Sequence, residues 1–277
     1  MENCPISSDE RLVKSWLRGR SKCTEAAYRS DLSGFVSAVG KPLADVTLED
    51  VQDWYGSLVG AEASKRRKLA AVKSCLRFAA ENRFIEHNVA SPVRPAKVQE
   101  DLHERILSEA EVLGMIEGED NARRKAVLRT LYLMGLRNAE ACGLTWRDLT
   151  RKKQGGTASI FGKGGKTRHV SVPASLWRQW EETRVDKRSD APVLIGVDGR
   201  ALNHEAISRI VKRAAKRSGI TAPVTPHWLR HACASHALDN GAPPHVVQAM
   251  LGHSSLATTT RYAHVRDGEG TGDWLKG

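Results

Sequence analysis

The feature that most constrains this chain is a run of three short helical segments near its end. The first is expected to begin at Thr225, a good N-cap that is followed by proline, and to end at Asn240-Gly241. The second closes at Gly252, and the third opens at Ser254 or Ser255. Turns as short as these pack three helices against one another, so side chains from all three are expected to meet in a small volume.

Side chains with useful chemistry lie on these segments. His227 and Arg230 are three residues apart on the first helix, on the face opposite its apolar stripe, and both are expected to point outward together with Ala234. His253 directly follows Gly252, and Tyr262 lies about two turns into the third segment. Each residue alone is ordinary on a protein surface. Their joint occurrence favours a site that combines two imidazoles, a guanidinium and a phenol.

The stretch Leu251-Gly-His-Ser-Ser-Leu-Ala-Thr-Thr-Thr-Arg-Tyr-Ala-His264, with His227-x-x-Arg230 upstream, resembles the tyrosine recombinase family of phage integrases and Xer-type resolvases. The step from His253 to Tyr262 is the one that this family uses. The resemblance is to the simple, Xer-like type. It implies a mainly α fold with a small β-sheet (α+β). It also implies a helical, SAM-like core-binding domain at 1–90, a linker at 91–105 and a catalytic domain at 106–277, which close on DNA as a C-shaped clamp.

The resemblance also assigns roles upstream. Gly135-Leu-Arg137-Asn-Ala-Glu140 matches the setting of the family's first catalytic arginine and its supporting acid. Gly135 permits a left-handed turn, and Asn138 is a suitable cap for the next helix. Without the resemblance, Arg137 and Glu140 would be interpreted as a local salt bridge.

A β-hairpin is expected from two short β-type runs, 157–161 and 168–172, around a glycine-rich tip. Lys163 in this tip matches the family's catalytic lysine, and Lys166 is close enough to compete for the role. The tip does not match a phosphate-binding P-loop, because the first glycine of that motif is missing and a strand follows. The P-loop interpretation is therefore rejected, and no nucleotide cofactor is expected for the family that the chain resembles.

Two four-residue patterns predict where helices begin. Thr47-Leu-Glu-Asp50 and Ser108-Glu-Ala-Glu111 both resemble capping boxes, and the second is expected to mark the start of the larger domain. Between the two domains, a stretch with Pro92 and Pro95 lacks periodicity and suits an extended linker.

The composition indicates which class of binding partner to expect. The chain has 277 residues, with 43 Lys plus Arg against 32 Asp plus Glu and a net charge of +11, which favours nucleic acid. No apolar run suits a membrane, no signal peptide is evident, and five scattered cysteines suit reduced thiols rather than a metal site, so a cytoplasmic protein is expected. Basic runs are often only solvated faces, but here phosphate contact is preferred. The predicted DNA contacts are Lys65, Arg66, Arg67, Lys68, Lys166, Arg209, Lys212 and Arg213.

Cleavage of a phosphodiester needs a nucleophile, cations for the developing charge and a proton for the leaving oxygen. By resemblance the partner is double-stranded DNA with a specific recombination site. The product is a 3′-phosphotyrosyl intermediate, formed in a tetramer on DNA without metal, ATP or nicotinamide. The expected roles are nucleophile for Tyr262, phosphate contacts for Arg137 and Arg230, proton acceptor or phosphate contact for His227, phosphate donor for His253 and general acid for Lys163.

Two other classes of protein stay open at this point. One is a DNA-binding regulator on an inactive recombinase fold, against which all six expected positions carry competent residues. The other is a type IB topoisomerase-like enzyme that only relaxes supercoils. The biological task also stays open between integration or excision, resolution and inversion.

Overall fold

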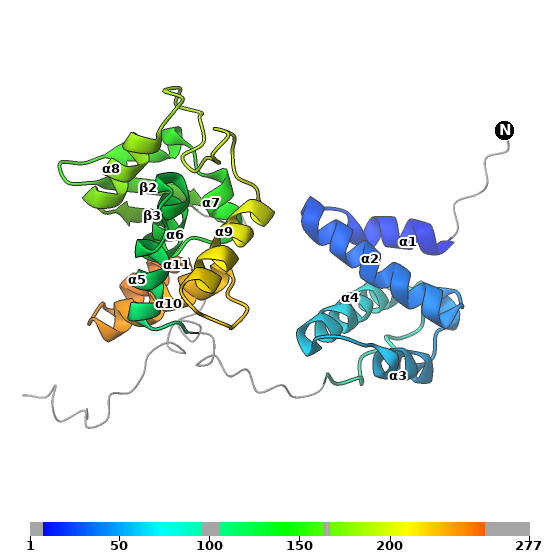
Figure 1. Ribbon diagram of the computed structural model, residues 1–277. Helices are drawn as coiled ribbons and strands as arrows, with labels where there is room; N and C mark the ends of the chain where they lie inside the picture. Colours follow the sequence, from blue (N-terminus) through cyan, green and yellow to red (C-terminus); the bar gives the residue numbers. More distant parts are fainter. Residues whose placement is uncertain (1–7, 96–105, 163–164, 166, 253–277) are drawn as a thin grey trace, which may run out of the picture. The chain divides into compact units, whose positions relative to one another are not determined.

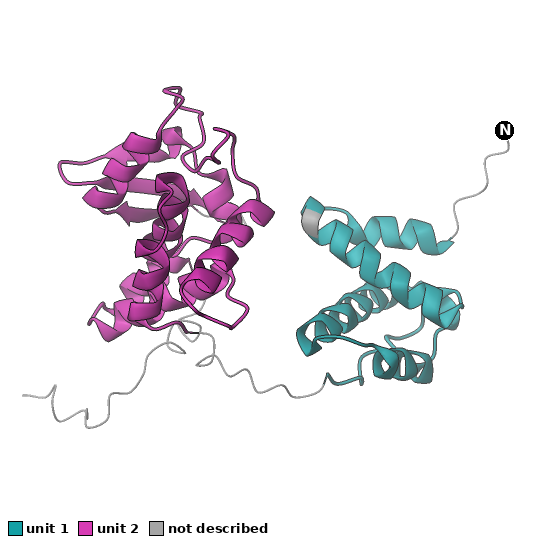
Figure 2. Ribbon diagram, in the orientation of Figure 1, with its two compact units in different colours: residues 1–100 teal, residues 101–277 magenta. Residues whose placement is uncertain are grey.

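The computed structural model describes residues 8–95, 106–162, 165 and 167–252. The chain divides into two compact units, residues 1–100 and 101–277 (Figure 2). Ala90 and Val93 are buried in the core of unit 1, and Lys73 Nζ donates to the carbonyl oxygens of Ser91 and Val93 at 3.0 Å each. The first residues of the predicted linker therefore pack on unit 1. Residues 96–105 lie outside the described part of the chain.

Unit 1 is helical. Its core is formed by apolar residues that recur at helical spacing, among them Phe35 on the second helix and Val72 and Leu76 on the last, each fully buried. The capping box predicted at Thr47 is confirmed, since the Asp50 backbone N–H donates to Thr47 Oγ1 and the Asp50 carboxylate accepts from the Thr47 N–H. Its elements are α1 (Ser8–Leu17), α2 (Lys22–Val39), η1 (Leu43–Asp45), α3 (Leu48–Ser57) and α4 (Glu62–Glu81) (Figure 1).

Unit 2 combines helices with one small sheet, so the expected mainly α fold with a small β-sheet is confirmed. Its first helix begins at the second predicted capping box, where Ser108 and Glu111 exchange hydrogen bonds. The elements are α5 (Glu109–Glu117), α6 (Ala122–Met134), α7 (Asn138–Gly143), η3 (Trp146–Asp148), β1 (Leu149–Arg151), β2 (Gly156–Phe161), β3 (Thr167–Val172), α8 (Ala174–Thr183), α9 (His204–Arg217), α10 (Pro226–Asp239) and α11 (Pro244–Leu251).

The sheet is antiparallel in the order β1-β2-β3, and β2 and β3 form the predicted hairpin. Along β3, residues alternate between the two faces, and Val170 and Val172 are buried beneath the sheet while His169 and Ser171 are exposed. Arg168 shares the inward-facing parity of the two valines. A charged residue at such a position requires a buried partner.

Helix α6 runs through the middle of unit 2, with the sheet and α8 at one end and α5 and α10 at the other (Figure 1). Its side chains Val127, Leu128 and Leu131 are fully buried. Helix α10 packs on α6 and also contacts α5, α9 and α11. Both helices are therefore enclosed, and groups carried at their ends are held rigidly.

Candidate active site and DNA-binding surface

The turn after α6 places the first predicted site residues. Gly135 has φ 56°, and a Cβ added to it would lie 2.7 Å from Leu251 Cδ2, so both its conformation and its surroundings require glycine. The predicted left-handed turn is confirmed. The expectation that Asn138 caps the next helix is wrong, because Arg137 occupies the N-cap position. The Asn138 amide instead donates to α9, to the His204 carbonyl at 3.1 Å and to Ser208 Oγ at 3.3 Å.

Arg137 and Glu140 form a salt bridge, the contact that would be expected of them without the resemblance. Arg137 Nη1 lies 3.0 Å from Glu140 Oε1, and the Arg137 backbone N–H donates to Glu140 Oε2 at 2.8 Å. The Glu140 side chain is only 6% exposed, whereas that of Arg137 is 42% exposed. Glu140 thus holds the start of α7 and one edge of the guanidinium, and Arg137 stays open to solvent.

A second arginine completes this ion pair, and its role was not predicted from the sequence. Arg168 on β3 donates to both carboxylate oxygens of Glu140, at 2.8 and 2.7 Å. Burial by itself raises the pKa of Glu140, but the hydrogen bonds from Arg168 and from the Arg137 backbone outweigh it, and the pKa lies below its ordinary value. The signal in the sequence was the charged residue at an inward-facing position of a strand.

Because the pKa of Glu140 is lowered in the folded protein, we expect the free energy of unfolding to depend on pH in the acid range. Its ionised form stabilises the fold fully above the ordinary pKa near 4.5, and this contribution is lost as pH falls through the lower folded value. Glu140→Gln is expected to reduce the free energy of unfolding by about 1–3 kcal/mol at neutral pH. Urea unfolding of both proteins at pH 7 and at acid pH should show this difference shrinking on acidification. A difference that does not change with pH would contradict the assignment.

Arg230 lies inside the protein, not on an outward face. It is 2% exposed and Ala234 is fully buried, so the predicted outward orientation of both residues is wrong. The cause is the position of α10, which other helices of unit 2 surround. The guanidinium of Arg230 donates to the carbonyl oxygens of Gly135 and Leu251, the latter at 2.6 Å. His227, one turn earlier, is exposed, and its ring centroid lies 4.2 Å from that of His231.

The described residues thus bring Arg137, Glu140 and Arg230 together at the end of α11. Arg137 Nη2 donates to the Gly252 carbonyl at 3.3 Å, next to the Leu251 carbonyl that Arg230 binds. The next residue in the chain is His253. The remaining predicted residues, Lys163, Lys166, His253 and Tyr262, lie outside the described residues.

A mainly basic groove of about 540 Å³ lies along α9 and reaches Asn138, the residue after Arg137. It is lined by Asn138, His204, Ser208 and one carboxylate, Glu205, and by cations along α9. The amide of Asn138 fixes α7 to α9, so the groove and Arg137 belong to one rigid surface. The lining cations are Arg209, Lys212, Arg213 and Lys216.

The predicted cations of unit 1 lie on the first turns of α4. Lys65 pairs with Glu62 at 2.8 Å, and Arg67 pairs with Asp31, a carboxylate that is only 4% exposed. Arg66 and Lys68 are partly exposed. Of the four cations, Arg67 therefore also links α4 to α2, whereas the pair of Lys65 with Glu62 lies within the first turns of α4.

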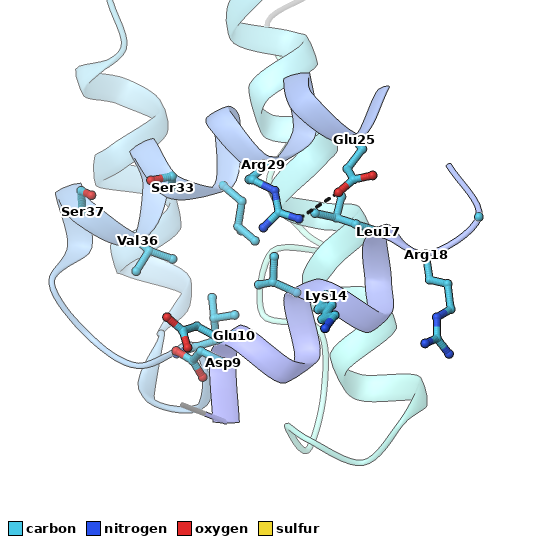
Figure 3. A pocket seen from close by; sticks show the side chains of 14 residues that line it. Asp9, Glu10, Lys14, Leu17, Arg18, Glu25, Arg29, Ser33, Val36 and Ser37 are labelled. Carbon is cyan, nitrogen blue, oxygen red and sulfur yellow. Dashed lines mark hydrogen bonds and ion pairs between the residues drawn. The ribbon is translucent and has the colours of Figure 1, made fainter. Parts of the chain in front are cut away.

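Unit 1 also has an apolar groove of about 830 Å³ between α1 and α2 (Figure 3). Leu17 and Val36 are among its apolar lining residues. Its charged residues are of both signs, and the Arg29–Glu25 ion pair of 2.9 Å lies at its edge. Mixed charge does not suit a run of phosphates, so this groove is not a candidate DNA contact. The charged residues are Asp9, Glu10 and Glu25, and Lys14, Arg18 and Arg29.

Two other features are absent from the described residues. No group of three or more His, Cys, Asp or Glu side chains among them has the arrangement to hold a metal ion. In the same part of the chain, every helix is too short or too polar to cross a membrane.

Comparison with known proteins places the chain in a family. Residues 97–269 match the model of the phage integrase family, and residues 15–83 match the SAM-like N-terminal domain of phage integrases. The tyrosine recombinase XerC of Corynebacterium glutamicum is 34% identical over 260 residues, which cover 89% of this chain and 83% of that protein.

The chain belongs to the phage integrase family.

It is thus a site-specific tyrosine recombinase, as the resemblance implied. The tyrosine recombinase XerD of Mycobacterium tuberculosis is 33% identical over 279 residues, covering 90% of this chain and 89% of that protein. The fold of the recombinase is similar to that of lambda integrase in a tetramer bound to a Holliday junction. That match has a TM-score of 0.76 and 20% identity, and covers 94% of this chain and 77% of the other.

Proposed function

We propose that this recombinase cuts and rejoins duplex DNA at a specific site through a covalent bond to Tyr262. The observation that carries the proposal is the convergence of Arg137 and Arg230 on the last turn of α11, directly before His253 in the chain. Two guanidinium groups at one place suit the nonbridging oxygens of a single phosphate, where negative charge grows in the transition state.

In the proposed step, the Tyr262 oxygen attacks the scissile phosphorus and the bond to the 5′ oxygen breaks. The phenolic proton passes to His227, which lies one helical turn before Arg230. Lys163 protonates the departing 5′ oxygen, with Lys166 as its alternative, and His253 donates to the phosphate. The 3′-phosphotyrosyl bond keeps the energy of the broken bond, so the 5′ hydroxyl of a second strand restores the phosphodiester and releases Tyr262.

The same proposal assigns the remaining surfaces to DNA. The α9 groove would bind the DNA backbone on the side of Arg137. The α4 cations would contact the same duplex from unit 1, so that the two domains close on DNA as a C-shaped clamp. The proposed domains are 1–90 for core binding, 91–105 as linker and 106–277 for catalysis. Four copies would assemble on two sites, by analogy with lambda integrase, which forms a tetramer bound to a Holliday junction. The cytoplasm is the proposed place of action.

The test is covalent capture. The protein is incubated in EDTA with a nicked duplex that contains a candidate site from beside its gene, and a denaturing gel then separates protein–DNA adducts. An adduct supports the proposal, and tight binding without an adduct would contradict it. A two-site exchange assay then separates recombination from supercoil relaxation, because relaxation needs no second site.

The proposed role of the α9 groove leads to a separate prediction about the affinity for DNA. Lys212→Ala is expected to weaken DNA binding and to reduce the slope of log K against log salt by roughly 0.9 for a lost phosphate contact, with cleavage of bound DNA unchanged. Titrations over a range of salt concentrations measure both quantities. The matched control is Lys14→Ala, in the groove of mixed charge, which should leave the slope as it is. Equal slopes for wild type and Lys212→Ala would show that Lys212 of the α9 groove does not contact DNA phosphates, which would contradict the prediction.

A further inference from the structure

Arg168 holds two parts of the site at once. Its Nη1 and Nη2 bind the two oxygens of Glu140 at 2.8 and 2.7 Å, while its Nε donates to the Met250 carbonyl on α11 at 2.7 Å. The side chain is 11% exposed, so the contacts are largely shielded from water. A planar guanidinium has its donors in a fixed arrangement. One rigid group therefore sets the distance between α7 and the last turn of α11.

The end of α11 is where three arginines meet. Its last carbonyls have no partner within the helix and carry the negative end of the helix dipole, which favours cations. The carbonyl oxygens of Met250, Leu251 and Gly252 accept from Arg168, Arg230 and Arg137, at 2.7, 2.6 and 3.3 Å. Arg137 and Arg230, which we assign to the phosphate, thus bind the same end of α11 as Arg168.

Arg168 also determines the net charge of the ion-pair group that contains Arg137 and Glu140. Glu140 accepts two hydrogen bonds from Arg168, one from the Arg137 side chain and one from the Arg137 backbone. Arg137 and Glu140 alone would be a neutral pair, whereas two arginines and one carboxylate carry a net charge of +1. The member of this group that solvent reaches best is Arg137, at 42% exposure against 11% for Arg168.

We propose that Arg168 is a positioning residue for strand cleavage. It fixes Arg137 through Glu140, ties both to the end of α11, and leaves this group of three residues with a net positive charge that Arg137 presents to the scissile phosphate. The inference rests on the proposed roles of Arg137 and Tyr262. The simpler alternative is an ion pair that only stabilises the fold.

The test measures the single-turnover rate of adduct formation by the full-length protein on the nicked duplex. Arg168→Gln is expected to lower this rate about 100-fold, because a small displacement of a phosphate ligand is costly. DNA affinity should be nearly unchanged, since Arg168 is buried. Arg168→Lys keeps the charge but loses the planar arrangement of donors, so its cleavage rate should lie between those of wild type and Arg168→Gln. Its unfolding midpoint should stay close to that of wild type.

A matched control is available in the same unit. Glu119 is 2% exposed and, like Glu140, binds two arginines, Arg124 and Arg217, and a backbone N–H. Arg124→Gln therefore removes a similar ion pair outside the proposed site, and it should cleave at the wild-type rate. A loss of rate in Arg168→Gln no larger than that in Arg124→Gln would overturn the proposal.

Two further readouts separate positioning from general destabilisation. If Arg168 acts through Glu140, the double variant with Glu140→Gln should cleave no more slowly than the slower single variant. A duplex with sulfur in place of the 5′ bridging oxygen needs no proton donor, so it should restore Lys163→Ala but not Arg168→Gln. Additive losses, or rescue of Arg168→Gln by sulfur, would overturn the positioning role. A wild type without adduct would overturn the proposed function itself.

Discussion

Replacement of Tyr262 by phenylalanine is expected to abolish covalent attachment to DNA while site binding stays nearly intact. The phenolic oxygen is the proposed nucleophile, and phenylalanine has no hydroxyl group that could form a phosphodiester with the 3′ end. Binding is proposed to depend instead on the cations of α9 and α4, which the substitution does not change. The effect on cleavage should therefore be complete, and the effect on affinity small.

The measurement is a denaturing gel for adducts, with a native titration of the same duplex beside it. Tyr28→Phe is the matched control, because Tyr28 stacks on Trp16 in unit 1, with ring centroids 5.4 Å apart, and has no proposed role. This control should form adducts as wild type does. An adduct that survives in Tyr262→Phe would require another nucleophile.

Arg230→Gln is expected to have the second largest effect, because it removes two functions at once. The Gly135 and Leu251 carbonyls lose a buried donor, and an unsatisfied buried acceptor costs about 1–3 kcal/mol. The scissile phosphate loses a charged ligand, which lowers the cleavage rate by about 10²–10³-fold or more. Urea unfolding and single-turnover cleavage measure the two losses separately.

The chain offers a control for the structural part of this effect. Arg123 Nη1 also donates to two backbone carbonyls, those of Gly196 and Val197, at 2.8 and 2.9 Å. Arg123→Gln should lower stability but leave cleavage by the folded protein at the wild-type rate. If Arg230→Gln and Arg123→Gln cleave alike once both are folded, Arg230 has no role at the phosphate.

Several expectations that depended on near neighbours in the chain were confirmed. The capping boxes at Thr47 and Ser108 are present, and Gly135 and Gly252 adopt the left-handed conformation that ends a helix. Each of these features involves groups within a few residues of one another, so a short pattern contains all the chemistry that the structure needs. The hairpin follows from the same kind of local pattern, and the α+β class that the resemblance implied agrees with it.

Expectations that depended on what surrounds an element were less secure. Helical spacing placed Arg230 and Ala234 on one face of α10, which is correct, but gave no indication that this face is buried too. Likewise Asn138 has the chemistry of a cap, yet its amide is used across the α7–α9 contact. A periodic pattern identifies faces of a helix, and only the neighbouring elements decide which faces are covered.

The sequence by itself determined the family, the element types and the residues with competent chemistry, because these are carried by short motifs and spacings. Only the tertiary structure decided how the site is held together. The contacts of Arg168 with Glu140 and Met250 join residues 28 and 82 positions apart, and the contact of Arg137 with Gly252 spans 115. Such pairings depend on the packing of α6, α10, α11 and the sheet, which brings together groups that no local pattern links.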